Sequence, residues 1–263
     1  MKVHTTYEPL TIMNTEPKYR RPLNNQQLQL LKTLYKFRCA TTGLIAETQG
    51  AKYIRVILGR LQVLEDQGYI GKKYDSSYKI ERKPASYHLL IKGIRIVKTL
   101  PGINQAAIKS LYYDRTASDE QIEHYLRVFQ LYNNIKLAYP DQFKFYSKTE
   151  LIGKDYVPAP IPDALLTRKK PSNTKPNDFF LDSIEQSLSY KLLISRIRKY
   201  VAFAESEAWE KKKQKDFPTL IFVCENELVQ KRVSFQMKKT LDTSYADLKY
   251  KIVVRDKLIE VLR

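Results

Sequence analysis

Two aspartates in the second half of the chain could take part in metal-assisted chemistry on phosphate. Asp163 lies in one strand-like run and Asp182 lies in the next. If the two runs pair as adjacent strands, their carboxylates form an oxygen site suited to a hard cation such as Mg²⁺. Both aspartates could equally be solvated, or paired with basic residues of the following helix, Lys191, Arg196 and Arg198. A metal site at Asp163 and Asp182 is therefore one of two hypotheses.

The histidines, cysteines and glycines of the chain do not indicate a further catalytic or metal-binding site or a phosphate-binding loop. His124 lies in a largely apolar helical stretch without a serine or cysteine nucleophile motif, so we interpret it as a structural histidine bonded to backbone or carboxylate. The three histidines form no His-x-His pair of the kind that tyrosine relaxases use to hold a metal, and the eight glycines form no phosphate-binding loop. Cys39 and Cys224 lie far apart without histidines at ligand spacing, which argues against a disulfide framework and a zinc site.

Basic and amide side chains over residues 51–83 point to contacts with DNA. The helix expected at residues 51–67 has an apolar face formed by Ile54, Ile57, Leu58, Leu61 and Leu64. Its other face carries Lys52, Arg55 and Gln62, with Tyr53 nearer the backbone of a bound duplex, and such side chains read guanine and adenine edges. The hairpin that follows is also basic, and we expect five of its residues to contact phosphate: Lys72, Lys73, Lys79, Arg82 and Lys83. Any amphipathic helix also exposes lysine and arginine, so the argument depends on the order of the elements.

The elements that must position these residues follow the order of a winged helix-turn-helix. Residues 24–100 are predicted to form two short helices, the longer basic helix, a hairpin with strands at residues 69–73 and 85–90, and a closing helix. Thr41 is suited to cap the second helix, and Gly68 to end the third. In such a fold the third helix enters the major groove and the hairpin grips phosphate. A winged helix that docks onto another protein is the alternative.

Charge and composition agree with a polyanionic partner. The 263-residue chain has a formal net charge of +18 and a sequence pI of about 9.6, which favours binding to nucleic acid that weakens as salt rises. An anionic membrane surface would also suit this charge, but no apolar stretch reaches the length of a transmembrane helix, and the N-terminus has no signal-peptide core. We therefore expect a cytoplasmic protein with no membrane partner.

The second half is predicted to be a mixed α/β layer. A helix from residue 119 precedes strands at residues 143–147, 161–167 and 179–184, a helix at 186–209, a strand at 218–224, a helix at 225–240 and a strand at 250–254. With Pro101-Gly102 as a break, four parts are expected: an extended or disordered arm (1–23), the winged helix-turn-helix (24–100), a linker (101–118) and the α/β domain (119–263). The fold class is α/β, or α+β over the whole chain.

The order of the second half resembles the core of the restriction-endonuclease-like, or PD-(D/E)XK, superfamily. In that superfamily an acid follows a proline on one strand, and an acid and a lysine on the next strand help to hold Mg²⁺ and orient the attacking water. Pro162-Asp163 and Asp182 match the acidic positions, but Ile184 stands where the lysine is expected. Lys191, at the start of the following helix, could reach inward instead, and Glu150 or Glu185 could supply a further carboxylate. The resemblance thus implies the two aspartates and Lys191 as catalytic residues.

Joined together, the two halves resemble the replication-relaxation family of plasmid and conjugative-element proteins. The resemblance rests on short motifs along nearly the whole chain: residues 26–38, Ala40-Thr41-Thr42, Arg60-Leu61, Gly68-Tyr69-Ile70, Tyr87-His88-Leu89, His124, Pro162-Asp163-Ala164, Phe179-Phe180-Leu181-Asp182, Lys199-Tyr200 and residues 220–223. It implies a winged helix joined to a nuclease-like domain in an accessory protein of DNA processing. Members of the family often carry an acid two residues after the position of Asp182, where this chain has Ile184, which argues against inherited metal chemistry.

Three functions follow as hypotheses. The first is a DNA-binding accessory or regulatory protein of a plasmid or mobile element, acting in replication, mobilisation or transcription, with an inactive nuclease-like domain and no cofactor. The second is a Mg²⁺-dependent DNA nuclease or nickase targeted by the winged helix. The third is a winged-helix docking subunit of a transfer or replication complex. The expected partners are double-stranded DNA and replication or transfer proteins, and a homodimer is left open because winged helices often bind inverted repeats as dimers.

Overall fold

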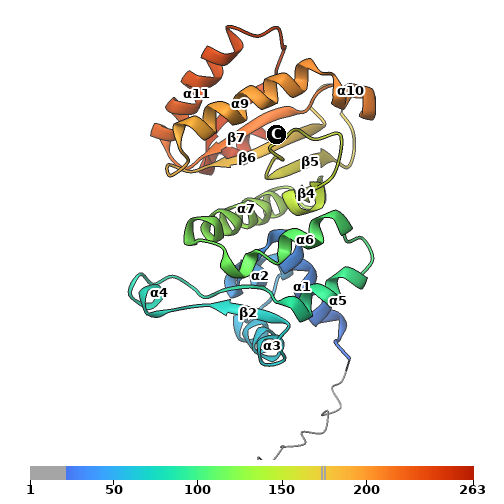
Figure 1. The fold of residues 1–263 in the computed structure, drawn as a ribbon, viewed down its shortest axis with the longest axis vertical. Helices are drawn as coiled ribbons and strands as arrows, with labels where there is room; N and C mark the ends of the chain where they lie inside the picture. The colour runs from blue at the N-terminus through green and yellow to red at the C-terminus, as the bar shows by residue number, and fades with distance from the viewer. Residues whose placement is uncertain (1–21, 173, 175) are drawn as a thin grey trace, which may run out of the picture.

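The computed structural model describes residues 22–172, 174 and 176–263. Apart from Pro22 and Leu23, the arm predicted over residues 1–23 lies outside the described residues, as does the N-terminal stretch expected to lack a signal-peptide core. Figure 1 shows the N-terminal elements in the lower half of the view and a five-stranded sheet with its helices in the upper half. Helix α7 (Asp119–Ala138) lies between the two halves. The molecule is therefore mixed α/β, as predicted.

The elements of residues 24–100 follow the predicted order, with two additions. They are α1 (Asn25–Phe37), β1 (Cys39–Thr41), α2 (Thr42–Gln49), α3 (Ile54–Asp66), β2 (Ile70–Lys73), α4 (Ser76–Ile80), β3 (Ser86–Leu89) and α5 (Ile91–Thr99). The strands form an antiparallel sheet in the order β1-β3-β2. The additions are β1 and α4, which are too short for the spacing of apolar residues to reveal them. Helix α4 lies within the link of the hairpin and begins after the capping side chain of Asp75.

Local hydrogen bonds and backbone geometry explain where α1 and α2 begin and where α3 ends. Asn24 and Gln27 form a reciprocal capping box at the start of α1. The Thr41 hydroxyl accepts a hydrogen bond from the backbone N–H of Leu44 at the start of α2, as the sequence predicts. Gly68 follows α3 with a φ of 72°, a conformation that costs glycine little because it has no Cβ.

The buried face of α3 is narrower than the spacing of its apolar residues predicts. Ile57, Leu61 and Leu64 are fully buried in the hydrophobic cluster of the N-terminal elements. Ile54 and Leu58, which the spacing assigns to the same face, are 57% and 45% exposed. This part of the prediction is wrong because α3 packs on its neighbours along one narrow stripe and leaves both flanks in solvent.

Residues 101–118, predicted to be a linker, fold into three short helical turns that pack against α1. The turns are η1 (Gln105–Ala107), α6 (Ile108–Leu111) and η2 (Asp114–Thr116). Ile108 and Leu111 are buried in the same hydrophobic cluster as α1. Arg38, which follows α1, donates hydrogen bonds to the Ser110 hydroxyl at 2.8 Å and to both carboxylate oxygens of Asp114. The segment is therefore fastened to the end of α1 by apolar packing and by a buried ion pair.

The second half forms one sheet covered by helices. Its elements after α7 are β4 (Phe143–Ser147), α8 (Lys148–Leu151), β5 (Ala164–Arg168), β6 (Asp178–Ile184), α9 (Tyr190–Glu205), α10 (Ala208–Lys213), β7 (Thr219–Cys224), α11 (Glu227–Leu241), β8 (Tyr250–Val254), η3 (Arg255–Lys257) and α12 (Leu258–Val261). The strand order is β4-β5-β6-β7-β8, in which β4 to β6 are antiparallel and β6 to β8 are parallel. The strands predicted at residues 143–147 and 250–254 have the observed bounds.

Several other bounds in this half differ from the prediction by one to four residues, and two of the differences have a clear local cause. The single helix expected at residues 186–209 is two helices, α9 and α10, which separate where Glu207 adopts a left-handed φ of 54°. Strand β5 begins at Ala164, three residues later than expected, because the segment before it contains Pro160 and Pro162, which have no backbone N–H to donate to a neighbouring strand.

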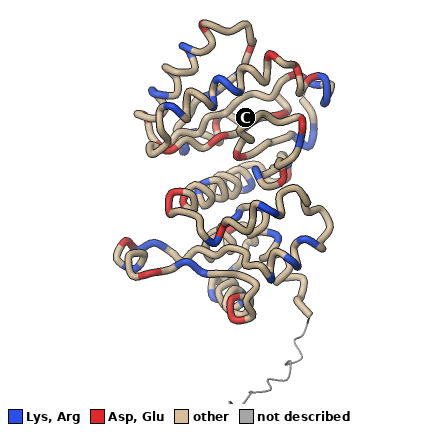
Figure 2. The backbone as a smooth tube through the Cα atoms, in the orientation of Figure 1, with Lys and Arg blue, Asp and Glu red and all other residues tan. Residues whose placement is uncertain are grey.

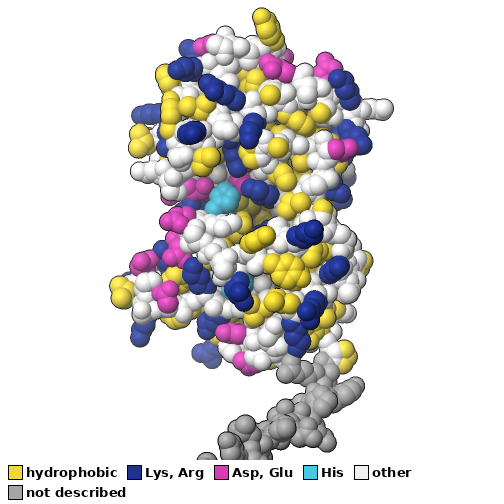
Figure 3. Space-filling model, viewed as in Figure 1, with side chains coloured by type: hydrophobic (Ala, Val, Ile, Leu, Met, Phe, Trp, Pro, Cys, Tyr) yellow, Lys and Arg dark blue, Asp and Glu magenta, His cyan; other side chains and the backbone are white. Residues whose placement is uncertain are grey.

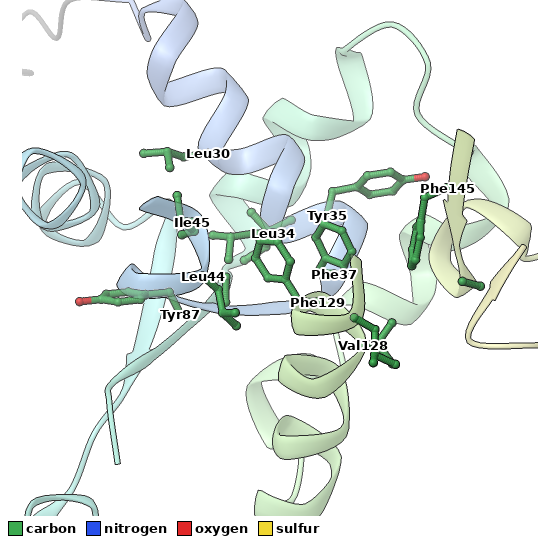
Figure 4. Packing of buried hydrophobic residues seen from close by; sticks show 14 of the residues in the cluster. Leu30, Leu34, Tyr35, Phe37, Leu44, Ile45, Tyr87, Val128, Phe129 and Phe145 are labelled. Carbon is green, nitrogen blue, oxygen red and sulfur yellow. The ribbon is translucent and has the colours of Figure 1, made fainter. Parts of the chain in front are cut away.

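Alternating side chains bury both faces of the central strands. Phe179 and Leu181 of β6 belong to a hydrophobic cluster that includes α7 and continues into α1, α2 and α3. Phe180, between them, belongs to a second cluster with α9 and α11. Figure 4 shows Phe37 of α1 facing Phe129 of α7, and their rings stack with centroids 4.0 Å apart. Helix α7 therefore packs against the N-terminal elements on one side and against the sheet on the other.

Both cysteines are buried as protonated thiols. Cys39 and Cys224 are free and buried, as expected from the sequence. Burial raises the pKa of each thiol to about 12, so neither is a thiolate at neutral pH. No helix in the described ranges has the length and apolar character needed to cross a membrane.

Candidate functional site

The fold brings the two predicted aspartates together between β5 and β6. Asp163 immediately precedes β5, and Asp182 lies on β6, the neighbouring antiparallel strand. The Oδ1 atom of Asp182 accepts a hydrogen bond from the backbone N–H of Asp163 at 3.1 Å. Each side chain is only 1% exposed. The two carboxylates therefore lie side by side, away from bulk water.

Helix α9 supplies the partners of Asp182. The Nη1 atom of Arg196 lies 2.7 Å from Asp182 Oδ1, and the Tyr200 hydroxyl donates to Asp182 Oδ2 at 2.9 Å. Arg196 and Tyr200 are one helical turn apart, so both point from α9 to the same place on the sheet. Burial raises the pKa of Asp182, and the charge of Arg196 opposes that shift. The carboxylate is thus neutralised by a resident guanidinium.

Asp163 is held by three different elements. His124 of α7 places its Nε2 atom 3.0 Å from Asp163 Oδ1, and the backbone N–H of Ser183 donates to Oδ2 at 3.0 Å. The Nζ atom of Lys148, at the start of α8, lies 3.9 Å from Oδ1. Burial would raise the pKa of Asp163, but the charge of His124 and the hydrogen bond to it hold the pKa well below the usual range.

His124 bridges two carboxylates. Its Nδ1 atom lies 3.0 Å from Glu185 Oε1, on the opposite side of the ring from Asp163. Burial would lower the pKa of His124, but the charge of Asp163 and the hydrogen bonds to Asp163 and Glu185 raise it to about 10. Both ring nitrogens then carry a proton at neutral pH, and each donates to a carboxylate. Glu185 also accepts from the Ser183 hydroxyl at 2.8 Å and lies 3.5 Å from the guanidinium of Arg127.

These residues, which we call the carboxylate cluster, do not fit a Mg²⁺ site. The cluster comprises Asp163, Asp182 and Glu185 with the basic residues His124, Arg127, Lys148 and Arg196 and with Tyr200. Mg²⁺ needs oxygen ligands in near-octahedral geometry. All four carboxylate oxygens of the two aspartates already accept a hydrogen bond or face a basic side chain. Among the described residues, no group of three or more metal-binding side chains is arranged to hold an ion.

A cavity of about 390 Å³ borders the cluster at the junction of the two halves. His124, Lys148 and Asp163 line one part of it, and apolar and aromatic side chains line much of the rest, including Phe37, Tyr125 and Ile161. His124 and Lys148 retain partial exposure of 23% and 44%. Solvent therefore reaches the cluster through this cavity past His124 and Lys148, while Asp163, which also lines the cavity, is only 1% exposed.

The contacts of His124 and Arg196 agree with expectations from the sequence, whereas those of Lys191 and Tyr200 do not. His124 is bonded to carboxylate, and Arg196 is an ion-pair partner of Asp182, as considered above. Lys191, the third predicted catalytic residue, is exposed at the start of α9 and, within the described residues, pairs with neither aspartate. Tyr200 was not predicted to contact Asp182, although its spacing of four residues from Arg196 on a helix was the available signal.

The candidate DNA-binding residues in α3 and just before it are exposed. Lys52, Tyr53, Arg55 and Gln62 all face solvent. The Nζ atom of Lys52 lies 5.4 Å from the centre of the Tyr53 ring, and Gln62 donates to the Asp66 carboxylate one turn further along the helix at 2.8 Å. Within the described residues, neither Lys52 nor Arg55 takes part in an ion pair, so both charges are available to a partner.

The five basic residues of the hairpin divide into two groups. Lys73 pairs with Asp119 at 2.5 Å, and Lys83 pairs with Glu123 at 2.8 Å, which ties the hairpin to the start of α7. The other three are exposed and, in the part of the chain that the structure describes, form no ion pair: Lys72, Lys79 and Arg82. Figure 2 shows both basic and acidic residues along the hairpin around α4. A search for positive charge in the sequence cannot separate the two groups, because Glu123 lies 40 residues from Lys83 along the chain. Lys83 also pairs with its near neighbour Glu81 at 2.7 Å.

Comparison with known proteins identifies the family of the chain. No curated protein and no solved structure matches it. A family model described as replication-relaxation matches residues 31–220, from within α1 to the second residue of β7. The match spans the exposed helix α3, the hairpin and the whole carboxylate cluster. Because it covers well over half of the chain, the protein belongs to the replication-relaxation family.

Proposed function

We propose that the protein is a DNA-binding accessory or regulatory protein of a plasmid or mobile element, acting in replication, mobilisation or transcription. Residues 24–100 would form a winged helix-turn-helix that binds double-stranded DNA. One observation carries the proposal: five basic side chains in or just before α3 and in the hairpin are exposed and form no ion pair among the described residues, namely Lys52, Arg55, Lys72, Lys79 and Arg82. Membership of the replication-relaxation family supports a role connected with replication, and the formal net charge of +18 supports a polyanionic partner.

The α/β half would support this role without cleaving DNA. The resident guanidinium of Arg196 and the imidazolium of His124 neutralise the carboxylates that a metal-dependent nuclease would need for its ion. In this proposal the carboxylate cluster joins α7 to β6 and α9, and so holds the proposed DNA-binding half against the sheet.

A DNA nuclease is the second candidate, favoured by the pairing of two buried aspartates on adjacent strands. It predicts nicking of duplex DNA with Mg²⁺ or Mn²⁺, and a rise in the Tm of the wild-type protein on addition of either ion. Both effects would be lost in Asp182→Asn. Our proposal predicts no nicking and no metal-dependent change in Tm for the wild-type protein. Circular dichroism of Asp182→Asn is the control that the variant still folds.

Binding to DNA is tested with a library of randomised duplexes. Retention of selected duplexes on the protein at moderate salt, with an affinity that falls as salt rises, is the expected result. Arg55→Ala should weaken binding to the selected duplex by roughly 1–3 kcal/mol if Arg55 reads a base. The apparent stoichiometry and the symmetry of the selected site show whether one copy or a homodimer binds. Failure to retain any duplex would instead favour the third hypothesis, a docking subunit of a transfer or replication complex.

A further inference from the structure

The exposed surface of α3 combines a polar row with two apolar flanks. At about 3.6 residues per turn, the row farthest from the buried stripe of the helix consists of Arg55, Gly59, Gln62 and, at the last residue of the helix, Asp66. Branched apolar side chains lie on either side of this row and are substantially exposed: Ile54 at 57%, Val56 at 45%, Leu58 at 45% and Val63 at 41%. A helix that needs only to be solvated would carry polar residues at these positions.

The charges around α3 show which kind of partner would cover these flanks. Lys52, Arg55 and Arg60 lie toward the start and middle of the helix, and the acidic residues Glu65 and Asp66 lie only at its end. The basic hairpin follows immediately. Basic residues surround α3, and apolar side chains flank its outer row. Such a surface complements a partner whose edges are anionic and whose centre presents both hydrogen-bond acceptors and methyl groups. The major groove of duplex DNA has that composition wherever thymine occurs, because thymine places its C5 methyl group there.

The centre of the outer row allows a close approach. A Cβ atom built on Gly59 would meet nothing within 4 Å beyond its chain neighbours and the backbone of its own helix, so packing inside this chain does not require glycine at that position. With no side chain there, Arg55 and Gln62 project on either side of an open backbone segment. A partner can then come into contact with the helix backbone at Gly59, and the apolar side chains on both flanks can contact the same partner. Figure 3 shows how widely basic side chains are distributed over one face of the molecule.

We propose that α3 recognises duplex sites that contain thymine, through contacts of Leu58 and its neighbouring apolar side chains with thymine methyl groups, next to a base pair read by Arg55. The inference rests on the proposed DNA-binding function and adds the base composition of the target. Leu58 is a specificity-determining residue in this account, because its side chain contributes little to the core of the chain.

The test exchanges thymine for uracil, which lacks only the C5 methyl group. A duplex selected from the randomised library is synthesised with thymine and again with uracil at each thymine position. We expect binding to weaken about fourfold for each contacted methyl group that is removed. Leu58→Ala should prefer the thymine duplex over the uracil duplex less than the wild-type protein does, by about the fourfold effect of one methyl contact. Leu137→Ala, which changes a 77% exposed leucine on α7, should keep the preference of the wild-type protein.

Three results would overturn the inference, and they are distinguishable. Equal binding of the thymine and uracil duplexes by the wild-type protein would show that the flanks do not contact methyl groups, although DNA binding itself would stand. Retention of no duplex at all would remove the proposed function together with this inference. A concentration-dependent dimer that Leu58→Ala dissociates in the absence of DNA would show that a second copy of the chain covers the flanks. Circular dichroism of each variant confirms folding.

Discussion

His124 joins carboxylates from two parts of the sheet, so its charge links the stability of the molecule to pH. One ring nitrogen faces Asp163 before β5, and the other faces Glu185 after β6. Its pKa of about 10 in the folded protein lies above the value of about 6.5 for an unfolded chain. The folded state therefore holds the proton over a pH range in which the unfolded state releases it.

We predict that the stabilisation due to His124 is fully present below about pH 6.5 and is lost as pH rises toward 10. The difference in free energy of unfolding between the wild-type protein and His124→Gln should shrink over this range, at most by about 1.4 kcal/mol per pH unit. Urea unfolding at a series of pH values measures the difference. Parallel stability curves for the two proteins would contradict the protonated bridge.

Arg196 is the residue on which the neutrality of Asp182 depends. Removing one partner of a buried ion pair leaves the other charge without compensation, so Arg196→Ala should lower the free energy of unfolding by about 3–5 kcal/mol. Arg198→Ala, at an exposed position two residues away on α9, should change it by no more than about 0.5 kcal/mol. Added Mg²⁺ or Mn²⁺ should raise the Tm of Arg196→Ala but not of Arg198→Ala. Equal stability of the two variants would mean that the guanidinium does not neutralise the cluster.

At the scale of elements, the hairpin between β2 and β3 has both a structural and a binding role. Lys83 is tied to Glu123 of α7, and the hydroxyl of Tyr78 on α4 donates to Asp119 at 3.1 Å. The neighbouring Arg82 forms no ion pair among the described residues. Lys83 and Arg82 can therefore be compared directly, because they are adjacent in the chain and, among the described residues, only Lys83 is already ion-paired.

We predict that Arg82→Ala weakens binding to duplex DNA more than Lys83→Ala does. If Arg82 contacts a phosphate, its loss should reduce the slope of log affinity against log salt by about 0.9, similarly for every duplex sequence. Lys83→Ala should change this slope little, because Glu123 and Glu81 compete with phosphate for the ammonium group. Fluorescence anisotropy titrations at several salt concentrations measure both slopes. Equal losses in the two variants would show that the ion pairs of Lys83 open on binding.

Elements whose residues repeat over several turns or alternate in a strand could be predicted from the sequence. Helix α3 and strands β4 and β8 are examples, because periodicity reports which side of an element is covered. Strand β1 and helix α4 could not be predicted, because each has too few residues for a period and depends on pairing or capping. The exposure of Leu58 could be recognised only in the folded structure, since the spacing of apolar residues does not show how wide the surface that covers the helix is.

The same limit applies to the candidate sites. The sequence marked Asp163 and Asp182, because a pair of acids in successive strands is a local pattern. It offered Arg196 as one of three possible basic partners, but it could not mark His124 as the partner of Asp163, since these two residues meet only when α7 packs on the sheet. Ion pairs between distant segments leave no spacing in the sequence.

At the scale of the whole molecule, one hydrophobic cluster connects the two halves. It runs from the core of α1, α2 and α3 through Phe129 of α7 to the face of the sheet that carries Phe179 and Leu181. A second cluster, with Trp209, lies on the other face of the sheet. Since α7 contributes to the packing of both halves, disruption of its contacts with α1 should also lower the stability of the half that contains the five-stranded sheet.

Unfolding should therefore occur as one cooperative transition, and Phe129→Ala should lower the stability of both halves together. Trp209 is the only tryptophan and is buried on the far side of the sheet, so its fluorescence reports the α/β half, while far-ultraviolet circular dichroism reports all helices. Loss of the stacked ring should cost about 3–5 kcal/mol and shift the midpoints seen by both probes equally. Phe235→Ala, which changes a 63% exposed side chain on α11, is the matched control. If Phe129→Ala moved the dichroism midpoint and left the fluorescence midpoint in place, the halves would unfold independently, because coupling through α7 requires that neither can lose its packing alone.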